Sequence, residues 1–139
     1  AEMLDNVLQF FIDNAPDTVK RARFSAMRER SIGIGALGFH AYLQKKSLPF
    51  ECAMAKVLNN RIFSHIKTKV TEASIQLGTE RGEAPDAEGT GQRFSHTMAI
   101  APNASSSIIM GNTSPSIEPY RANAYRQDTL SGAFLNKNK

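Results

Sequence analysis

Apolar residues recur at helical spacing at the start and in the middle of the chain. Near the N-terminus they are three and four positions apart, which predicts a helix over about residues 3–12 that ends near Asn14. From Glu51 a longer stripe of the same kind predicts the longest helix, which Gly82 should end. The expected inward residues are Met3, Leu4, Val7, Leu8 and Phe11 in the first helix, and Ala55, Leu58, Ile62, Ile66, Ala73 and Leu77 in the second.

Two short segments have a different pattern, typical of buried strands. In residues 31–39 apolar side chains alternate with glycine, which indicates a strand that another backbone or a ligand approaches closely, followed by a short helix from about Phe39. Residues 96–101 are almost continuously apolar and stop at Pro102. After Pro102, small residues lead into an expected helix of about two turns that Gly111 and Asn112 should cap, and residues 123–130 suggest one more strand.

The segments between these elements indicate how the chain is divided into parts. Residues 82–91 carry turn formers without periodicity and predict an exposed loop, the best candidate for a linker. We therefore expect one α/β chain, predominantly helical with a few short strands. Its parts would be a helical part over about 1–82, a loop over 83–91, a strand–loop–helix over about 94–111 and a tail over 112–139.

Composition narrows the class of protein. The chain has 139 residues, 41% of them hydrophobic and 22% charged, with a single cysteine, which excludes disorder, collagen and a disulfide scaffold. Its longest apolar runs are a few residues, far short of the roughly 20 that cross a bilayer. One unpaired cysteine and no basic, apolar leader predict a cytoplasmic address. Because the chain opens without an initiator methionine, we expect a piece of a larger protein.

The net charge of +4 would favour an anionic partner without identifying one. The basic residues cluster over positions 20–30, which could be a patch that binds RNA or another nucleic acid, or simply a solvated helical face. No aromatic residues interleave at stacking positions, so the solvated face is the favoured interpretation. The cluster consists of Lys20, Arg21, Arg23, Arg28 and Arg30.

A glycine motif and a serine cluster are the candidates for binding chemistry. Residues 33–38 match the Gly-x-Gly-x-x-Gly spacing of dinucleotide sites, but no hydrophobic strand precedes them, so we interpret these glycines as close backbone packing. After Pro102, by contrast, Asn103 and three serines surround the start of a helix, where unpaired amides favour phosphate. The alternative is that Ser105 or Ser106 only caps the helix.

No catalytic group can be assembled from this chain. Cys52 has no nearby group to lower its pKa and is interpreted as a packing residue, and His40, His65 and His96 lack metal-ligand spacing. Glu118 is expected in a surface turn. We therefore predict no catalytic residue and no metal site.

Several stretches, in the same order, resemble the large, catalytic subunit of class I ribonucleotide reductase. They lie in the later part of its ten-stranded α/β barrel domain. The stretches are Arg30-Ser31-Ile32-Gly33-Ile34-Gly35 with Gly38, Leu48-Pro49-Phe50-Glu51, Glu72-Ala73-Ser74, Met98-Ala99-Ile100-Ala101-Pro102-Asn103-Ala104-Ser105-Ser106, Ser116-Ile117-Glu118-Pro119-Tyr120 and Leu130-Ser131-Gly132-Ala133-Phe134.

The resemblance gives the segment after Pro102 a role. In that family it cradles the diphosphate of a ribonucleoside diphosphate, so Asn103, Ala104, Ser105 and Ser106 would contact phosphate oxygens and Pro102 would border the nucleoside. The family also implies three partners, namely the remainder of the large subunit, a radical-generating small subunit, and thioredoxin or glutaredoxin as reductant. No cofactor is expected in this chain itself, and uncovered strand edges would favour self-association.

The sequence also departs from the family pattern. Gly91-Gln92-Arg93-Phe94 stands where the family has Gly-Leu-Arg-Asn, and an insertion with a tryptophan is missing. The radical and redox cysteines, the allosteric sites and the C-terminal tyrosines of the family have no counterpart here. The resemblance therefore implies a substrate-binding fragment that is inactive by itself.

Overall fold

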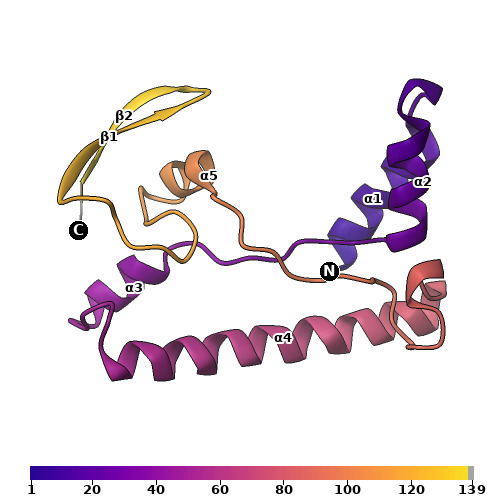
Figure 1. Cartoon of the computed structure of the whole chain (residues 1–139), viewed down its shortest axis with the longest axis horizontal. Helices are drawn as coiled ribbons and strands as arrows, with labels where there is room; N and C mark the ends of the chain where they lie inside the picture. Colours follow the sequence, from indigo (N-terminus) through magenta and orange to yellow (C-terminus); the bar gives the residue numbers. More distant parts are fainter. Residues whose placement is uncertain (138–139) are drawn as a thin grey trace. The chain divides into compact units, whose positions relative to one another are not determined.

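The computed structural model describes residues 1–137, and contacts between its residues divide the chain into two compact units. The first unit comprises Ala1–Ile34 and Phe63–Ala99, and the second comprises Gly35–Ile62 and Ile100–Lys139. The helix α4 (Ala53–Arg81), labelled in Figure 1, contributes residues to both units. Its expected apolar stripe is confirmed, since Ala55 and Leu77 are buried and the stripe residues between them are half-buried.

Two helices open the first unit, namely the predicted N-terminal helix and one that carries most of the basic cluster. They are α1 (Glu2–Asn14) and α2 (Lys20–Glu29), joined by the short 3-10 turn η1 (Asp17–Val19). The expected inward face of α1 is only partly correct, because Leu4 packs against the core whereas Met3 and Val7 are 73% and 61% exposed. The core of this unit brings together Ile32, Leu77 and Phe94, with Ala1, Leu4 and Ile34 packed against them.

Two backbone segments run parallel in this unit, one after α2 and one before Pro102. The Ile32 N–H donates to His96 O (2.9 Å), the Ile34 N–H to Thr97 O (3.0 Å), and the Ala99 N–H returns to Ile34 O (3.2 Å). The close backbone approach predicted at the glycines is confirmed at Gly33, where an added Cβ would lie 2.9 Å from the Ala99 Cβ.

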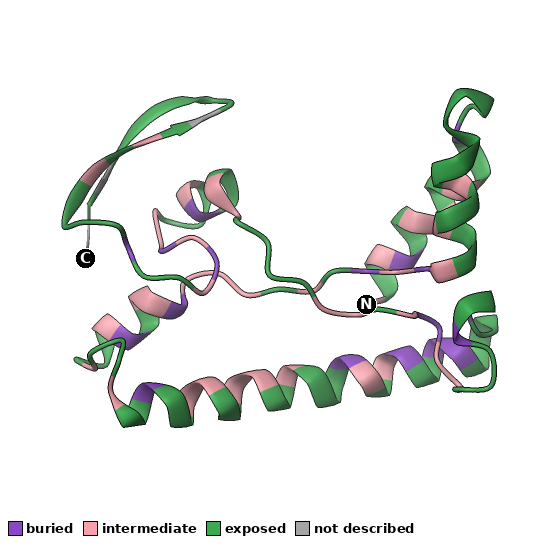
Figure 2. Ribbon diagram, viewed as in Figure 1, coloured by how far each residue is buried: buried purple, intermediate pink, exposed green. Residues whose placement is uncertain are grey.

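The predicted strands are nevertheless much shorter than expected. Regular pairing is limited to one parallel bridge between Ile34 and Met98, and Ala99 and Ile100 are exposed (Figure 2). A strand extends only as far as its partner continues the hydrogen-bond ladder. The prediction of a buried strand over residues 96–101 is therefore wrong beyond that short contact.

The segment after α4 is not the linker that its composition predicts, because all of it belongs to the first unit. Gly82, at φ +86°, ends the helix as expected. Glu83 then accepts the N–H groups of Gly89 (2.5 Å) and Gly91 (3.1 Å). The 3-10 turn η2 (Pro85–Ala87) lies within this loop, and Ala84 and Ala87 are buried.

The second unit contains α3 (Phe39–Lys45), α5 (Ala104–Ile109) and a hairpin of β1 (Ala124–Thr129) and β2 (Gly132–Lys137). The strands pair antiparallel, with Gln127 opposite Phe134. The strand expected over residues 123–130 is thus confirmed, whereas the sequence did not predict β2. Residues 138 and 139 of the predicted tail lie outside the described residues.

Candidate functional site

The residues predicted to bind phosphate lie together at the start of α5. Asn103 precedes the helix in the left-handed conformation (φ 48°, ψ 30°), and its carbonyl accepts the Ser107 N–H (2.9 Å). Its side chain donates to Ala101 O (3.1 Å) and does not cap the helix. The alternative that a serine caps the helix finds no support in the described residues, where α5 has no side-chain cap hydrogen bond.

The backbone at the start of α5 has a conformation that suits anion binding. A left-handed residue followed by a right-handed helical one turns successive N–H groups into a shared concavity that suits an anion. Among the described residues, the amides of Ala104, Ser105 and Ser106 have no acceptor. The side chains of Ser105 and Ser106 are exposed. Since α5 has only six residues, individual amides matter more here than a helix dipole.

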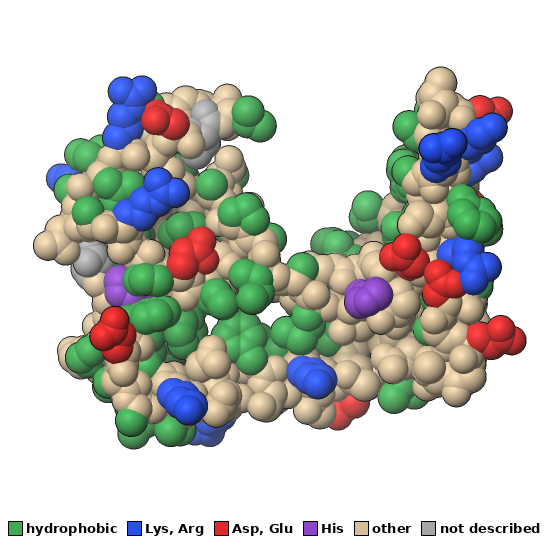
Figure 3. All heavy atoms as spheres, viewed as in Figure 1, with side chains coloured by type: hydrophobic (Ala, Val, Ile, Leu, Met, Phe, Trp, Pro, Cys, Tyr) green, Lys and Arg blue, Asp and Glu red, His purple; other side chains and the backbone are tan. Residues whose placement is uncertain are grey.

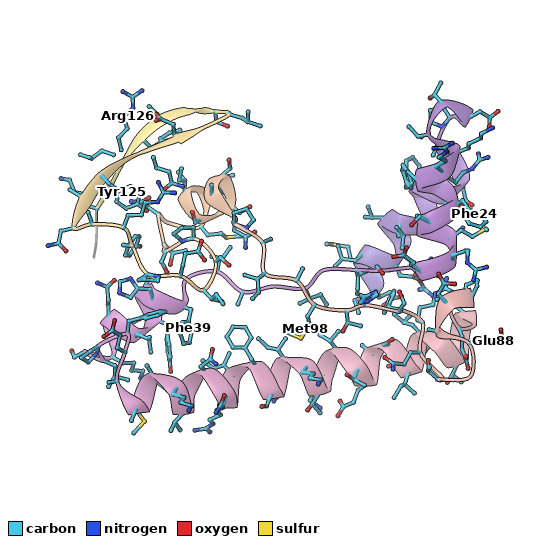
Figure 4. All side chains as sticks on the ribbon, viewed as in Figure 1. Phe24, Phe39, Glu88, Met98, Tyr125 and Arg126 are labelled. Carbon is cyan, nitrogen blue, oxygen red and sulfur yellow. The ribbon has the colours of Figure 1, made fainter. Side chains whose placement is uncertain are left out.

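A cavity of about 290 Å³ adjoins this turn within the second unit. Pro102 and Ala104 form one wall, and β1 forms another (Figure 4 labels Tyr125 and Arg126 on this strand). The complete lining is Pro102, Ala104, Pro115, Glu118, Pro119, Arg121, Tyr125, Arg126, Gln127 and Asp128.

The cavity is lined by two basic and two acidic side chains, so their formal charges cancel. Arg126 pairs with Asp128 of the same strand (2.8 Å), and both side chains are largely exposed. Arg121 has no ion-pair partner among the described residues, and Glu118, exposed as predicted, contributes one carboxylate. An anion in this cavity would therefore depend on the backbone amides and on Arg121.

A side chain that the sequence did not predict attaches the hairpin to the turn of residues 103–106, which we call the serine turn. The Gln127 side-chain amide donates to Ala104 O (3.3 Å), and the buried Ser107 hydroxyl donates to the same carbonyl (2.8 Å). Nothing in local periodicity marks Arg121 or Gln127 as part of a site, and both lie in the predicted tail over 112–139. The only signal nearby was the family-like stretch at residues 116–120.

The start of helix α3 is hydrogen-bonded to Ser114, in the segment between α5 and β1. The Gly38 N–H donates to Ser114 O (2.8 Å) and the Ala41 N–H donates to the Ser114 hydroxyl (3.1 Å). Gly38 adopts φ +80°, and a Cβ there would lie 2.8 Å from the Thr113 Oγ1. With Gly33 packed on Ala99, these contacts show Gly33 and Gly38 in close packing roles, in agreement with our interpretation.

The basic cluster at positions 20–30 is not uniformly solvated. Arg30 is buried, which contradicts its assignment to an exposed face, because it donates to Asp5 at 2.6 and 3.1 Å. Arg28 pairs with Asp86, and Arg23 pairs with Asp17 (3.3 Å). Of the five residues in the cluster, Lys20 and Arg21 have no ion-pair partner among the described residues. Figure 3 colours every Lys and Arg side chain blue, so the blue surface here includes paired arginines as well. The cluster is therefore weaker as a nucleic-acid site than its charge count suggests.

The other candidate residues stay separate. Cys52 is half-buried, and its sulfur accepts the Ala55 N–H (3.4 Å), in keeping with a packing role. Within residues 1–137, no group of three His, Cys, Asp or Glu side chains could hold a metal ion. No described helix is long and apolar enough to cross a membrane.

Comparison with known proteins decides the family. The family described as "Ribonucleotide reductase, barrel domain" matches residues 1–90 and 84–139. The chain belongs to this family. It is 61% identical, over all 139 residues, to the ribonucleoside-diphosphate reductase large subunit of Invertebrate iridescent virus 3, of whose length it spans 22%.

Other members of the reductase family extend the comparison. The chain is similar to the class Id ribonucleotide reductase alpha subunit of Actinobacillus ureae, with a TM-score of 0.82 and 39% identity over 86% of this chain and 23% of that one. It is also 33% identical, over 90% of its length, to 18% of a vitamin B12-dependent ribonucleoside-diphosphate reductase from Thermoplasma acidophilum. The predicted resemblance to the reductase large subunit is thus confirmed, and the chain is part of the barrel domain.

Proposed function

We propose that this stretch of the reductase barrel, expected to have ten strands, holds the diphosphate of a ribonucleoside diphosphate. The amides of Ala104, Ser105 and Ser106 would donate to phosphate oxygens, with the two serine hydroxyls beside them. Asn103 sets the turn that aims these amides, and Pro102 borders the nucleoside. The observation that carries the proposal is that these three amides have no acceptor among the described residues, and that the first of them, Ala104, lines a cavity that Arg121 also lines.

The complete enzyme would replace the ribose 2′-hydroxyl by hydrogen through protein radicals. This chain would contribute orientation of the substrate, which can lower a barrier without any reacting group of its own. The radical source and the reductant would come from elsewhere. A small subunit with thioredoxin or glutaredoxin is our proposal, and one relative of the chain is named as a vitamin B12-dependent reductase.

The test compares two substitutions of one residue by calorimetric titration of the 139-residue chain with ADP. Ser105→Ala removes the hydroxyl, whereas Ser105→Pro removes the hydroxyl and the amide at the second helical position, where proline is tolerated. We expect Ser105→Ala to weaken binding about fivefold and Ser105→Pro about tenfold further, because a donor to a charged group is lost each time.

Ser64→Ala, an exposed serine on α4, is the matched control and should bind as the wild type does. A circular dichroism spectrum checks that each variant folds. Equal affinity in Ser105→Ala, Ser105→Pro and the control would contradict a role for this turn.

A further inference from the structure

The wall of the cavity that contains Pro119 and Arg121 is attached to α3 by a histidine. Tyr120 lies between these two residues, and its backbone N–H donates to the His40 Nδ1 (3.1 Å). A ring nitrogen that accepts a hydrogen bond carries no proton, so the imidazole is neutral with its proton on Nε2.

The surroundings of His40 fix the ring in this role. Its centroid lies 5.4 Å from that of Tyr120 and 5.7 Å from that of Phe50, both in edge-on geometry. Tyr120 is itself buried, and its hydroxyl donates to Asn112 O (3.3 Å). Tyr120 is therefore held at two points: its backbone N–H is bound by His40, and its side-chain hydroxyl is bound to the Asn112 carbonyl.

We infer that His40 is a positioning residue for the anion site, and that protonation of its Nδ1 releases the Tyr120 amide and weakens binding. The inference rests on the proposed function of the serine turn. Once Nδ1 carries a proton, two donors face each other across the contact, and the hydrogen bond is replaced by repulsion. Pro119 and Arg121 then lose the backbone anchor between them.

The electrostatic surroundings set the direction of the pH dependence. Burial lowers the pKa of His40 below its ordinary value of 6.5, and no charged neighbour acts in the opposite sense. The titratable group facing the ring is the Tyr120 phenol, whose pKa is raised by burial and by Tyr125, and from the other side the ring faces Phe50. His40 has no ion pair within the described residues. It is thus neutral at neutral pH and takes up its proton only as the pH falls below 6.5.

Two variants separate titration from packing. In His40→Gln an amide oxygen can accept the Tyr120 N–H but does not titrate, whereas His40→Ala removes the acceptor. Pyrophosphate affinity of the 139-residue chain is measured by calorimetry at about pH 7.5 and about pH 5.5. Because pyrophosphate also takes up protons in this range, the quantity compared is the ratio of wild-type to His40→Gln affinity, in which the titration of the ligand cancels.

We expect this ratio to be near one at the higher pH and to fall about fivefold at the lower pH, the loss of one hydrogen bond. His40→Ala should bind pyrophosphate more weakly than the wild type does at the higher pH. A ratio that does not change with pH would overturn the role of His40, even if His40→Ala fails to fold. Wild-type protein that binds no pyrophosphate at the higher pH would instead overturn the proposed function.

Discussion

At the scale of single residues, Asp5 is a buried carboxylate that is paired with three arginines. Its carboxylate is 1% exposed and accepts hydrogen bonds from Arg30, Arg81 and Arg93 at 2.6 to 3.3 Å. Arg93 also donates to the carbonyls of Arg81 and Gly82, at the end of α4. A single acid on α1 therefore ties together the ends of α2 and α4 and the segment after the loop.

Replacing Asp5 should strongly destabilise the folded chain. Asp5→Asn leaves three guanidinium groups around a neutral side chain, and we expect a loss of about 3–5 kcal/mol in the free energy of unfolding, measured by urea denaturation. Asp13→Asn, which changes an exposed carboxylate of the same helix, should stay within about 0.5 kcal/mol of the wild type. Similar midpoints for the two variants would contradict this role of Asp5.

The same residue predicts how stability changes in acid. Burial acts to raise the pKa of Asp5, but hydrogen bonds from Arg30 and Arg81, the charge of Arg30 and a bond from Arg93 lower it overall. A lowered pKa means that the unfolded chain binds the proton more tightly. The stabilisation is therefore fully present above about pH 3.8 and lost as the pH falls through the native pKa. Urea denaturation below pH 4 should show this loss in the wild type and not in Asp5→Asn.

At the scale of elements, one glycine in α4 is required by packing, although glycine has a low helix propensity. Gly78 is a poor helix former inside a 29-residue helix. A Cβ at this position would lie 2.3 Å from the Gly91 carbonyl oxygen and 3.1 Å from the Arg93 nitrogen. The glycine therefore allows the backbone of residues 91–93 to pack directly on the helix, where the Arg93 N–H reaches Ser74 O (3.0 Å).

Gly78→Ala should consequently destabilise the chain, although alanine is ordinarily favoured over glycine in a helix by about 1 kcal/mol. We expect a loss of about 1–3 kcal/mol in urea denaturation, because an extra methyl group is forced against backbone. Thr79→Ala, on the exposed side of the same turn, should change stability by less than about 0.5 kcal/mol. A stabilised Gly78→Ala variant would show that the close contact is absent.

The accuracy of the sequence-based predictions also varies by element. Helices α1, α3, α4 and α5 follow from local spacing and stop signals, because a helix satisfies its own backbone hydrogen bonds. The strands do not, since their hydrogen-bond partners come from distant residues such as Ile34 and Met98. Asn103, Ser105 and Ser106 were predicted from their residue types and Ala104 from the family resemblance, whereas Arg121 and Gln127 come close to this turn only through the folding of the hairpin.

At the scale of the whole molecule, the chain spans 22% of the length of one viral relative, and we propose that the complete activity needs more than these residues. We expect the isolated 139-residue chain, supplied with a small subunit and a dithiol, to form no deoxynucleotide, because it has no reacting cysteine pair. Chromatographic analysis of the nucleotides measures this. Adding an active, complete large subunit is the positive control, and any product formed without it would overturn the fragment role.

The sequence by itself determined the helices, the turn after Pro102 and membership of the reductase family, because helical periodicity, small residues and short motifs are local properties. Only the tertiary structure decided that Asp5 gathers three arginines, that the loop over 83–91 is part of a packed unit, and that His40 accepts the Tyr120 amide. These contacts join residues up to 88 positions apart. Burial and pairing at such separations depend on how the chain folds back on itself, which no local pattern encodes.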